Sequence, residues 1–265
     1  MTRNPDVAVT VVIPAYNAAR TIASTLESVI AQTHTNWEAV VVDDHSSDET
    51  RAIVEGFAAR DSRIRLLALE KNNGAPAAPR NRGLESASSP WVAFLDSDDL
   101  WHPQKLELQL EALSATGETF SCTAMRDFAD GASVVDTDVL TPVQTHLIAF
   151  ANHRIKGRIP ASSVVVSTEL ARRFPFEEDR SYKAVEDYHC WLRILHSGVR
   201  CLKLDAPLLN YRRIVGQISG SKLTMMRRVF HVHRNFEQTS PVSAAFFTGT
   251  HVLFSVYLRF NKKGL

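Results

Sequence analysis

Short apolar runs alternate with amphipathic stretches over the first hundred residues of the chain. The apolar runs have the length of buried strands and occupy residues 7–14, 37–44, 63–69 and 91–96. Between and after them, helices are predicted at residues 21–32, where Ile22, Leu26, Val29 and Ile30 share one face, and at residues 46–60, 77–88 and 103–113. Because strands that alternate with helices pair in parallel through right-handed crossovers, this part of the chain is predicted to form an open parallel α/β sheet.

The starts of two of these helices carry capping signals. Ser46 is followed three residues later by Glu49, which is the spacing of a capping box and predicts that a helix opens there. Pro103 would stand at the first position of the fourth helix, where proline is favoured. Both helices are therefore expected to begin at these signals.

The second half of the chain is less regular. Three strand-like runs occupy residues 162–167, 199–204 and 208–212. Residues 188–195 repeat large apolar side chains at i, i+3, i+4 and i+7, which predicts a helix. The segment from about residue 222 to the end is also expected to be helical.

Composition and charge limit the class of protein. The chain has 265 residues, 45% of them hydrophobic, which is enough for one large core or two modest ones. Thirty basic and 29 acidic side chains leave a net charge of +1, so no global field indicates a nucleic-acid partner. The charge is uneven, however, because residues from Lys222 onward carry +6 and residues 1–221 carry −5.

Cysteine content and hydropathy bear on the compartment. Three cysteines without a C-x-x-C pattern indicate buried thiols in a reducing compartment, not a disulfide framework or a zinc site. The first ten residues lack the apolar core of a signal peptide, so a cytoplasmic location is expected. Residues 242–258 contain Ser, Thr and Gly and are shorter than the roughly 20 apolar residues of a spanning helix, so no transmembrane span is expected.

Acidic side chains follow two of the predicted strands. Asp43 and Asp44 end the second strand, and the fourth runs into Asp96, Asp98 and Asp99. In an open parallel sheet the carboxyl ends of the strands share one edge, and ligands bind beyond that edge. A cluster of carboxylates repels a bare phosphate but suits a hard divalent cation, which reverses the local charge and can bridge to a diphosphate. These residues therefore predict a metal ion together with a phosphorylated ligand.

A simpler alternative stays open for the same residues. Asp98 or Asp99 could cap the helix that follows, and Ser46 or Asp48 could cap the helix at residues 46–60, without any ligand. The chain has neither a G-x-G-x-x-G loop after the first strand nor a Walker A loop, so a metal would have to take the role of a glycine-rich phosphate cradle. Two acidic strand ends on one edge favour the ligand site.

Four segments of the chain can be compared with known families, namely VVIPAYNAARTIASTLESVIAQT, EAVVVDDHSSDET, APRNRGLESASSPWVAFLDSDDLW and VEDYHCWLRIL. In letters, order and spacing they resemble the family 2 inverting glycosyltransferases of the GT-A fold. The resemblance covers about residues 7–222, and the first hundred residues are its most specific part. Within the family, the chain is most similar to bacterial enzymes of the teichuronic-acid and exopolysaccharide type, which add one sugar to a growing surface polymer.

The resemblance implies a fold class and a division of the chain. The implied fold is an α/β GT-A (Rossmann-like) fold, a mostly parallel sheet flanked by helices with a helical C-terminal tail. Residues 1–221 would form the glycosyltransferase domain, in which residues 1–100 bind the nucleotide sugar and residues 101–221 bind the acceptor. Residues 222–265 would form a basic, amphipathic helical tail.

The resemblance also implies roles for individual residues. Pro14 and Tyr16 match the loop that lines the nucleotide base, and Asp44, with Asp43 beside it, matches the acid that bonds the base, usually uracil. Arg80 matches a basic residue near the nucleotide.

For the D-x-D motif and the reaction itself, three further residues are implied. Asp96 is expected on the ribose side and beside the metal, and Asp98 is expected to ligate the Mn²⁺ or Mg²⁺ that bridges the diphosphate. Asp187, the last residue of VED, matches the catalytic base, although its position before a helix would by itself indicate an ordinary N-cap.

The implied chemistry is consistent with these residue types. A metal stabilises the charge on the leaving nucleoside diphosphate, and a carboxylate takes the proton of the incoming sugar hydroxyl. An acid and a metal on opposite faces of the sugar give inversion. The implied donor is a nucleotide sugar, most commonly UDP-linked, and the implied acceptor is a glycan or a lipid-linked oligosaccharide.

One position departs from the family pattern. Ile214 stands where the family often has a histidine that helps to hold the metal or the diphosphate, so a third protein ligand is not expected from it. Among other candidates, Trp101 and Trp191 could stack on a sugar but are expected in the core, and His231 and His233 are expected to be solvated.

The tail allows two interpretations. One helical stripe contains Phe246, Phe247, Leu253, Phe254, Tyr257 and Leu258 and ends in Arg259, Lys262 and Lys263. Such a helix either lies on an anionic membrane, here the inner face of the cell membrane, or packs back on the domain with its charges solvated. A lipid-linked acceptor would favour the membrane.

Two other functions stay open as alternatives. The chain could be a domain that binds a nucleotide sugar or glycan without turnover, although the presence of Asp44, Asp98 and Asp187 together argues against it. A haloacid-dehalogenase-type phosphatase also has a D-x-D after an apolar strand, but it needs Thr or Val two residues after the second Asp, where Leu100 stands here.

Overall fold

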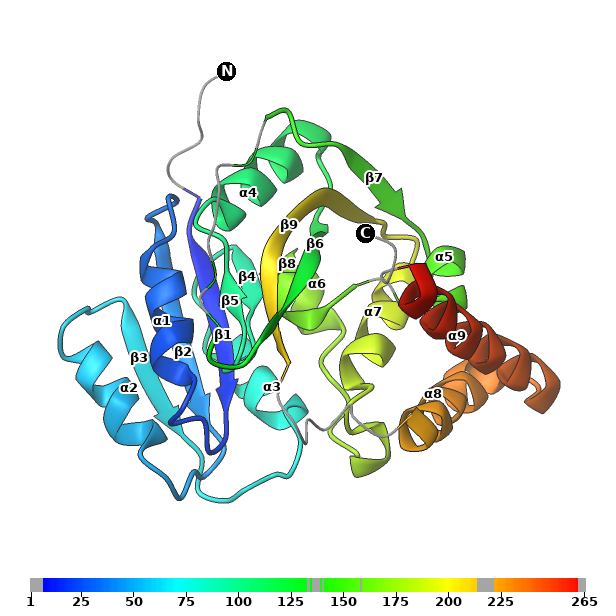
Figure 1. Ribbon diagram of the computed structural model, residues 1–265, viewed down its shortest axis with the longest axis horizontal. Coiled ribbons are helices and arrows are strands. Elements are labelled where there is room, and N and C mark those ends of the chain that lie inside the picture. The colour runs from blue at the N-terminus through cyan, green and yellow to red at the C-terminus, as the bar shows by residue number, and fades with distance from the viewer. Residues whose placement is uncertain are drawn as a thin grey trace.

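The computed structural model describes residues 7–132, 134, 139, 141–157, 159–213 and 222–261. Within these residues, nine strands form one sheet with helices on both faces (Figure 1). The strands are β1 (Val9–Ala15), β2 (Trp37–Asp43), β3 (Ile64–Ala68), β4 (Trp91–Phe94), β5 (Leu100–Trp101), β6 (Phe120–Ala129), β7 (Thr145–Ile148), β8 (Val165–Ser167) and β9 (Cys201–Arg213). The α-helices are α1 (Ile22–Ile30), α2 (Thr50–Ala58), α3 (Ala77–Glu85), α4 (Lys105–Thr116), α5 (Phe150–Ile155), α6 (Thr168–Arg173), α7 (Glu186–His196), α8 (Lys222–Asn235) and α9 (Pro241–Asn261). Three short 3-10 helices are η1 (Ala161–Ser163), η2 (Arg180–Tyr182) and η3 (Phe236–Gln238).

The strand order in the sheet is β3-β2-β1-β4-β8-β6-β9-β5, with β7 paired to β9. The first four strands pair in parallel, as the alternation of strands and helices predicted. The second half adds antiparallel pairs between β4 and β8, β8 and β6, β9 and β5, and β9 and β7, while β6 and β9 are parallel.

Two cores lie on opposite faces of the sheet, because successive side chains of a strand point to opposite faces. Val11 and Ile13 of β1 pack with α1, α2 and α4 on one face. Val12 packs with α3, α6 and α7 on the other. At Gly83 the helix α3 approaches so closely that an added Cβ would lie 2.3 Å from Cγ1 of Val12, so only glycine fits there.

Two predicted helix starts differ from the structure. The helix α2 begins at Thr50 with Glu49 as its N-cap residue and no side-chain cap, so the capping box of Ser46 and Glu49 is wrong. The hydroxyl of Ser46 instead accepts a hydrogen bond from the backbone N–H of Asn17, 2.9 Å away, and so joins the loops that follow β1 and β2. The helix α4 begins two residues after Pro103, at Lys105.

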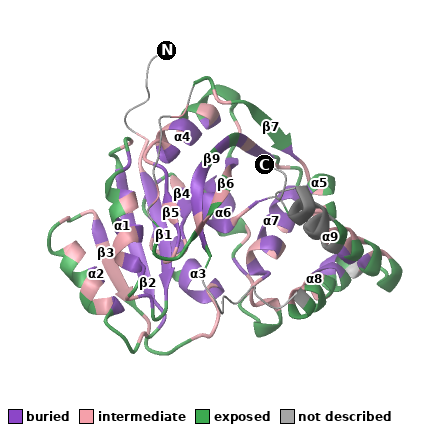
Figure 2. Cartoon of the chain, in the orientation of Figure 1, coloured by how far each residue is buried: buried purple, intermediate pink, exposed green. Residues whose placement is uncertain are grey.

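The C-terminal segment is helical, as predicted, and forms a hairpin of α8 and α9 at one end of the molecule (Figure 1). Its inner side packs on α5 and α7, and its outer side is exposed (Figure 2). None of the helices in the described ranges is both long and apolar enough to span a bilayer. The side chains of Phe254, Tyr257, Leu258 and Arg259, and the residues Lys262 and Lys263, lie outside what the structure describes.

Candidate active site

The carboxyl ends of β1, β2 and β4 lie at one edge of the sheet. Ala15 at the end of β1 pairs with Asp43 at the end of β2, and the backbone N–H of Leu95 after β4 donates to the carbonyl of Val12, 3.1 Å away. The acidic residues that follow these strands are therefore brought to the same edge, as the sequence predicted.

Asp43 and Asp44 are both buried and both engaged by protein groups. Oδ2 of Asp43 accepts from the backbone N–H of Ser46 at 3.0 Å and from Nε of Arg51 at 2.5 Å. The two carboxylate oxygens of Asp44 accept from the backbone N–H of Asn73 at 3.0 and 3.1 Å, and Oδ1 also accepts from the Asn73 amide at 2.7 Å. Both carboxylates thus fix the loops around this edge of the sheet.

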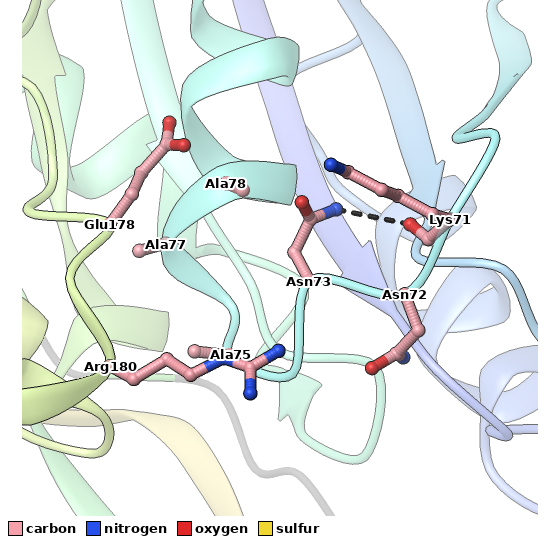
Figure 3. Close-up of a pocket in the computed structure, with 8 residues that line it drawn as sticks. All are labelled: Lys71, Asn72, Asn73, Ala75, Ala77, Ala78, Glu178 and Arg180. Atoms are coloured by element: carbon pink, nitrogen blue, oxygen red, sulfur yellow. Dashed lines mark hydrogen bonds between the residues drawn. The ribbon is translucent and has the colours of Figure 1, made fainter.

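A cavity of about 250 Å³ lies beside Asn73 (Figure 3). It is lined by Lys71, Asn72, Asn73, Ala75, Ala77, Ala78, Glu178 and Arg180. Asn73 is the direct link, because it lines the cavity and bonds Asp44 at the same time. Glu178 and Arg180 close the opposite side of the cavity from the second half of the chain, so the cavity lies between residues more than 100 positions apart.

The first predicted loop contributes one exposed ring at this edge. Pro14 is buried within β1 and pairs with Val42 of β2. Tyr16 is 53% exposed directly after β1. Neither residue lines the cavity, but the Tyr16 ring is accessible to a ligand at the carboxyl ends of the strands.

A buried arginine joins the D-x-D motif to the start of α7. Nη2 of Arg80 donates to Oδ1 of Asp96 at 2.6 Å, and Nη1 donates to Oε1 of Glu186 at 2.8 Å. Arg80 and Glu186 are each 3% exposed, whereas the Asp96 side chain is 34% exposed. Arg80 therefore positions Asp96 from the buried side of this carboxylate, and it does not line the cavity.

Asp187 stands in the first turn of α7, next to this buried pair. Its Oδ1 accepts from the backbone N–H of Tyr188 at 2.7 Å, and the N-cap residue of the helix is Val185, so the N-cap alternative for Asp187 is wrong. Burial and the neighbouring Glu186 carboxylate raise the pKa of Asp187 to about 7, against the opposing effect of Arg80. A carboxyl group with a pKa near 7 is matched to accept a proton at neutral pH.

The last two acids of the D-x-D segment differ in their surroundings. Asp98 is half-buried, and its backbone carbonyl accepts from Nε of Arg212 at 2.7 Å. Asp99 is buried, and its Oδ1 accepts from the backbone N–H of Arg212 at 3.0 Å. Burial, followed by repulsion from Asp96 and Asp98, raises the pKa of Asp99 well above its usual value. Neither acid caps α4, whose N-cap residue is Gln104, so that alternative is wrong.

Arg212 and Glu186 contribute to the site without having been assigned a role from the sequence. Besides its bonds to the D-x-D segment, the Arg212 guanidinium donates to Oγ of Ser24 at 3.0 Å and to Asp130 at 3.2 Å. The sequence signal that could have identified Arg212 is its position near the end of a predicted strand, after the run Leu-Leu-Asn-Tyr. Glu186 gave a weaker one, as an acid directly before the predicted base.

The carboxylates at this edge fit a divalent cation that is also held by waters and substrate phosphates. Within the described ranges, no three His, Cys, Asp or Glu side chains come together in a way that could hold a metal ion. Asp96 and Asp98 offer two carboxylates, and Mg²⁺ commonly uses one or two carboxylates together with waters and substrate phosphates. Ile214, at the family's histidine position, lies outside the described residues.

The remaining candidates are packed side chains. Trp101 and Trp191 are buried in the two cores, as expected. The expectation that His231 and His233 are solvated is wrong for His233, which is fully buried beneath α9, while His231 is half-buried. The sequence offered no sign of this, because His233 contacts residues of α7 and α9 that are 45 or 18 positions away.

Comparison with known proteins gives a consistent result. Residues 10–165 match the family model described as Glycosyl transferase family 2. The chain is 33% identical over 230 residues to TuaG from Bacillus subtilis (strain 168), named as a glycosyltransferase of teichuronic acid biosynthesis, with 87% of this chain and 88% of TuaG covered. It is 32% identical over 253 residues to the Escherichia coli protein WfgD, covering 95% of this chain and 94% of WfgD. WfgD is named UDP-Glc:alpha-D-GlcNAc-diphosphoundecaprenol beta-1,3-glucosyltransferase.

A solved structure is similar in fold. TarS from S. aureus, residues 1–349 in complex with UDP, aligns with a TM-score of 0.68 and 22% identity over 89% of this chain and 69% of that chain. This likeness confirms the predicted fold class, an α/β sheet flanked by helices. The phosphatase alternative has no support in these matches.

Proposed function

The chain belongs to glycosyl transferase family 2 and is a glycosyltransferase of the GT-A fold, and on this premise we propose that it moves one sugar from a UDP-sugar to a hydroxyl group of a glycan or lipid-linked acceptor, with inversion. The names of TuaG and WfgD support a role in the synthesis of a bacterial surface polysaccharide. The observation that carries the proposal is the position of Asp187, a carboxyl group with a pKa of about 7 that adjoins the Arg80 bridge to the D-x-D motif.

We assign donor binding to residues 1–100 and acceptor binding to residues 101–221. The uracil base is proposed to lie against the exposed ring of Tyr16, next to the cavity lined by Asn73. Asp44 then acts on the base through Asn73, whose backbone and side-chain N–H groups it already binds. Three further residues are proposed to hold the loops of the nucleotide site in place without contacting the nucleotide, because their side chains are buried. They are Pro14, Asp43 and Arg80.

Asp96 and Asp98 are the residues proposed to hold Mn²⁺ or Mg²⁺. When bound, the ion would supply Lewis-acid stabilisation of the charge on the leaving diphosphate. Arg80 keeps one oxygen of Asp96 occupied at 2.6 Å and so fixes the direction in which the remaining oxygen faces. Asp99 is not assigned to the metal, because it is buried and its Oδ1 already accepts from the Arg212 backbone N–H.

Asp187 is proposed to act as the general base. Its carboxylate takes the proton of the acceptor hydroxyl while the hydroxyl oxygen forms a bond to the anomeric carbon of the donor sugar. The bond from that carbon to the diphosphate oxygen breaks at the same time, and UDP leaves with the bonding electrons. A single displacement of this kind inverts the anomeric configuration and needs no covalent intermediate.

Product stereochemistry tests this function. We expect that the purified protein, supplied with Mn²⁺, a panel of α-linked UDP-sugars and a GlcNAc-diphospho-lipid acceptor, forms a β-linked product with release of UDP. The measurement is the anomeric proton–proton coupling of the product by NMR. A product that retains the α configuration would contradict the single displacement at Asp187.

Contact with a membrane surface is the remaining part of the proposal. Exposed apolar side chains recur on one stripe of α9 at Val242, Phe246 and Leu253, which are 80%, 64% and 71% exposed. On α8, the exposed Met226 and Phe230 lie among arginines. An apolar stripe with basic flanks suits the surface of an anionic bilayer, where a lipid-linked acceptor would be met at the inner face of the cell membrane.

Vesicle flotation checks this contact. The full chain is expected to float with phosphatidylglycerol vesicles and not with phosphatidylcholine vesicles. Phe246→Ser together with Leu253→Ser is expected to weaken that binding by at least about tenfold, because two exposed apolar side chains no longer enter the bilayer. Ile30→Ser on α1, an exposed apolar residue far from the hairpin, is the control and should bind as the wild type does. Equal flotation of the double variant would rule this stripe out as the contact.

A further inference from the structure

A buried cluster of rings joins the first turn of α7 to the C-terminal hairpin. The hydroxyl of Tyr188 lies 3.2 Å from Nε2 of His233 on α8 and 3.1 Å from Nε2 of His251 on α9. It also lies 3.3 Å from the carbonyl oxygen of Arg154 at the end of α5. One hydroxyl therefore meets three other helices at a single point.

Both imidazoles in this cluster are held in their neutral form. Burial lowers the pKa of His233 to about 3 and lowers the pKa of His251 from its usual value. Nε2 of His251 is 3.1 Å from the Arg154 carbonyl, which can only accept, so this nitrogen carries the ring proton. Burial raises the pKa of the Tyr188 hydroxyl and keeps it protonated. The hydroxyl can therefore accept from the Nε2–H of His251 and donate its own proton to Nε2 of His233.

Apolar packing holds the same turn of α7 against the hairpin. Val185, directly before α7, and Leu192, in its second turn, form one buried cluster with Val232 of α8 and Phe236 of η3. The tyrosine ring is 8% exposed, and ring centroids of His251 and Tyr188 are 4.9 Å apart. The hairpin is therefore part of the packing that fixes where α7 begins.

We propose that Tyr188 is a positioning residue for the reaction and that the α8–α9 hairpin acts through it on the base. Asp187 directly precedes Tyr188, and its Oδ1 accepts from the Tyr188 backbone N–H at 2.7 Å. The bonds of the Tyr188 hydroxyl to His233 and His251 fix the turn that carries Asp187, opposite the bond between Arg80 and Glu186. This inference rests on the proposed role of Asp187 as the base.

The variant Tyr188→Phe removes the hydroxyl and keeps the ring. Its kcat is expected to fall by about 10- to 100-fold, because a small displacement of a catalytic group is enough to cause losses of this size. Its Kd for UDP and its KM for the donor should stay within about twofold of wild type, since no donor contact is changed. Tyr182→Phe is the matched control, because the Tyr182 ring contacts His189 of the same helix, with centroids 4.5 Å apart, but its hydroxyl has no hydrogen-bond partner among the described residues.

Replacements of His251 provide a rescue test. His251→Gln keeps an N–H that can donate to the Tyr188 hydroxyl, whereas His251→Leu keeps volume but no polar group. The glutamine variant should retain most of the kcat, and the leucine variant should lose part of what Tyr188→Phe loses, because the hydroxyl then keeps its contacts with His233 and the Arg154 carbonyl. Adding Tyr188→Phe to His251→Leu should cost less than Tyr188→Phe does alone, because the contact between these two side chains is already lost.

The outcomes separate this inference from the function on which it rests. If Asp187→Asn abolishes transfer but folded Tyr188→Phe keeps the wild-type kcat, the positioning role is wrong and the base assignment stands. A lower melting temperature with unchanged kcat at 25 °C would likewise reduce the cluster to a structural contact. If Asp187→Asn itself retains transfer, the proposed mechanism fails whatever Tyr188→Phe does.

Discussion

Replacing Asp187 by asparagine is expected to lower the kcat of sugar transfer by about 10²- to 10⁴-fold, the usual contribution of a general base. The amide has nearly the shape of the carboxylate, so it should keep the contact with the Tyr188 backbone, but it cannot take the proton of the acceptor hydroxyl. Since Asp187 belongs to the acceptor side of the site, the affinity for UDP should not change. Steady-state kinetics together with a UDP titration measure both quantities.

The pH dependence of the rate gives the same variant a second readout. Because the pKa of Asp187 is raised to about 7, the wild-type kcat should rise roughly tenfold per pH unit up to that value and then level off. This rise should be missing in Asp187→Asn. Asp61→Asn, a carboxylate that pairs with Arg63 before β3 at the opposite edge of the sheet, is the control and should keep the wild-type profile. A wild-type rate that is flat between pH 5 and 7 would contradict the assignment.

Replacing Arg80 by methionine is expected to lower the free energy of unfolding by about 3–5 kcal/mol, the typical result of leaving a buried charge without its partner. Glu186 is 3% exposed, and its second oxygen Oε2 already has no hydrogen-bond partner among the described residues. Loss of Arg80 would also release Asp96 from its 2.6 Å contact. Urea denaturation followed by circular dichroism measures the change.

Two further variants make this result specific. Arg82→Met on the same helix removes an arginine whose pair with Glu85 is 54% and 61% exposed, and it should cost no more than about 1 kcal/mol. Adding Glu186→Gln to Arg80→Met should recover part of the lost stability, because the buried side chain is then neutral. If Arg80→Met unfolds within about 1 kcal/mol of wild type, the buried bridge does not support the site as described.

The half of the fold that could be predicted from sequence is the half with local signals. Each of the first four strands is an apolar run, and a helix follows β1, β2 and β3 directly, whereas the two-residue β5 lies between β4 and α4, so order and length suffice for β1 to β4. The two strand-like runs at residues 199–204 and 208–212 are in fact one strand, β9, of 13 residues. Pro207 lies between them in a region where the register to β6 shifts, so a break in the pattern did not mean a break in the strand.

For the site, sequence identified the acids but not their partners. The carboxylates of Asp44, Asp96 and Asp187 were all singled out, because they follow strands or match a motif. That Asp44 binds Asn73 and that Arg80 binds Glu186, 106 positions away, depends on which loops the sheet brings together. Such pairs carry no periodic signal, and the same holds for the buried environment of His233.

Titration of UDP into the purified protein, with and without Mn²⁺, measures whether the strand-end carboxylates form a metal-assisted nucleotide site. We expect binding by calorimetry that is at least about tenfold tighter, or 1.4 kcal/mol, when Mn²⁺ is present. Asp98→Asn should remove that dependence, and Asp61→Asn should keep it. UDP binding of equal strength with and without Mn²⁺, unchanged in Asp98→Asn, would show that these carboxylates do not form a metal-assisted nucleotide site.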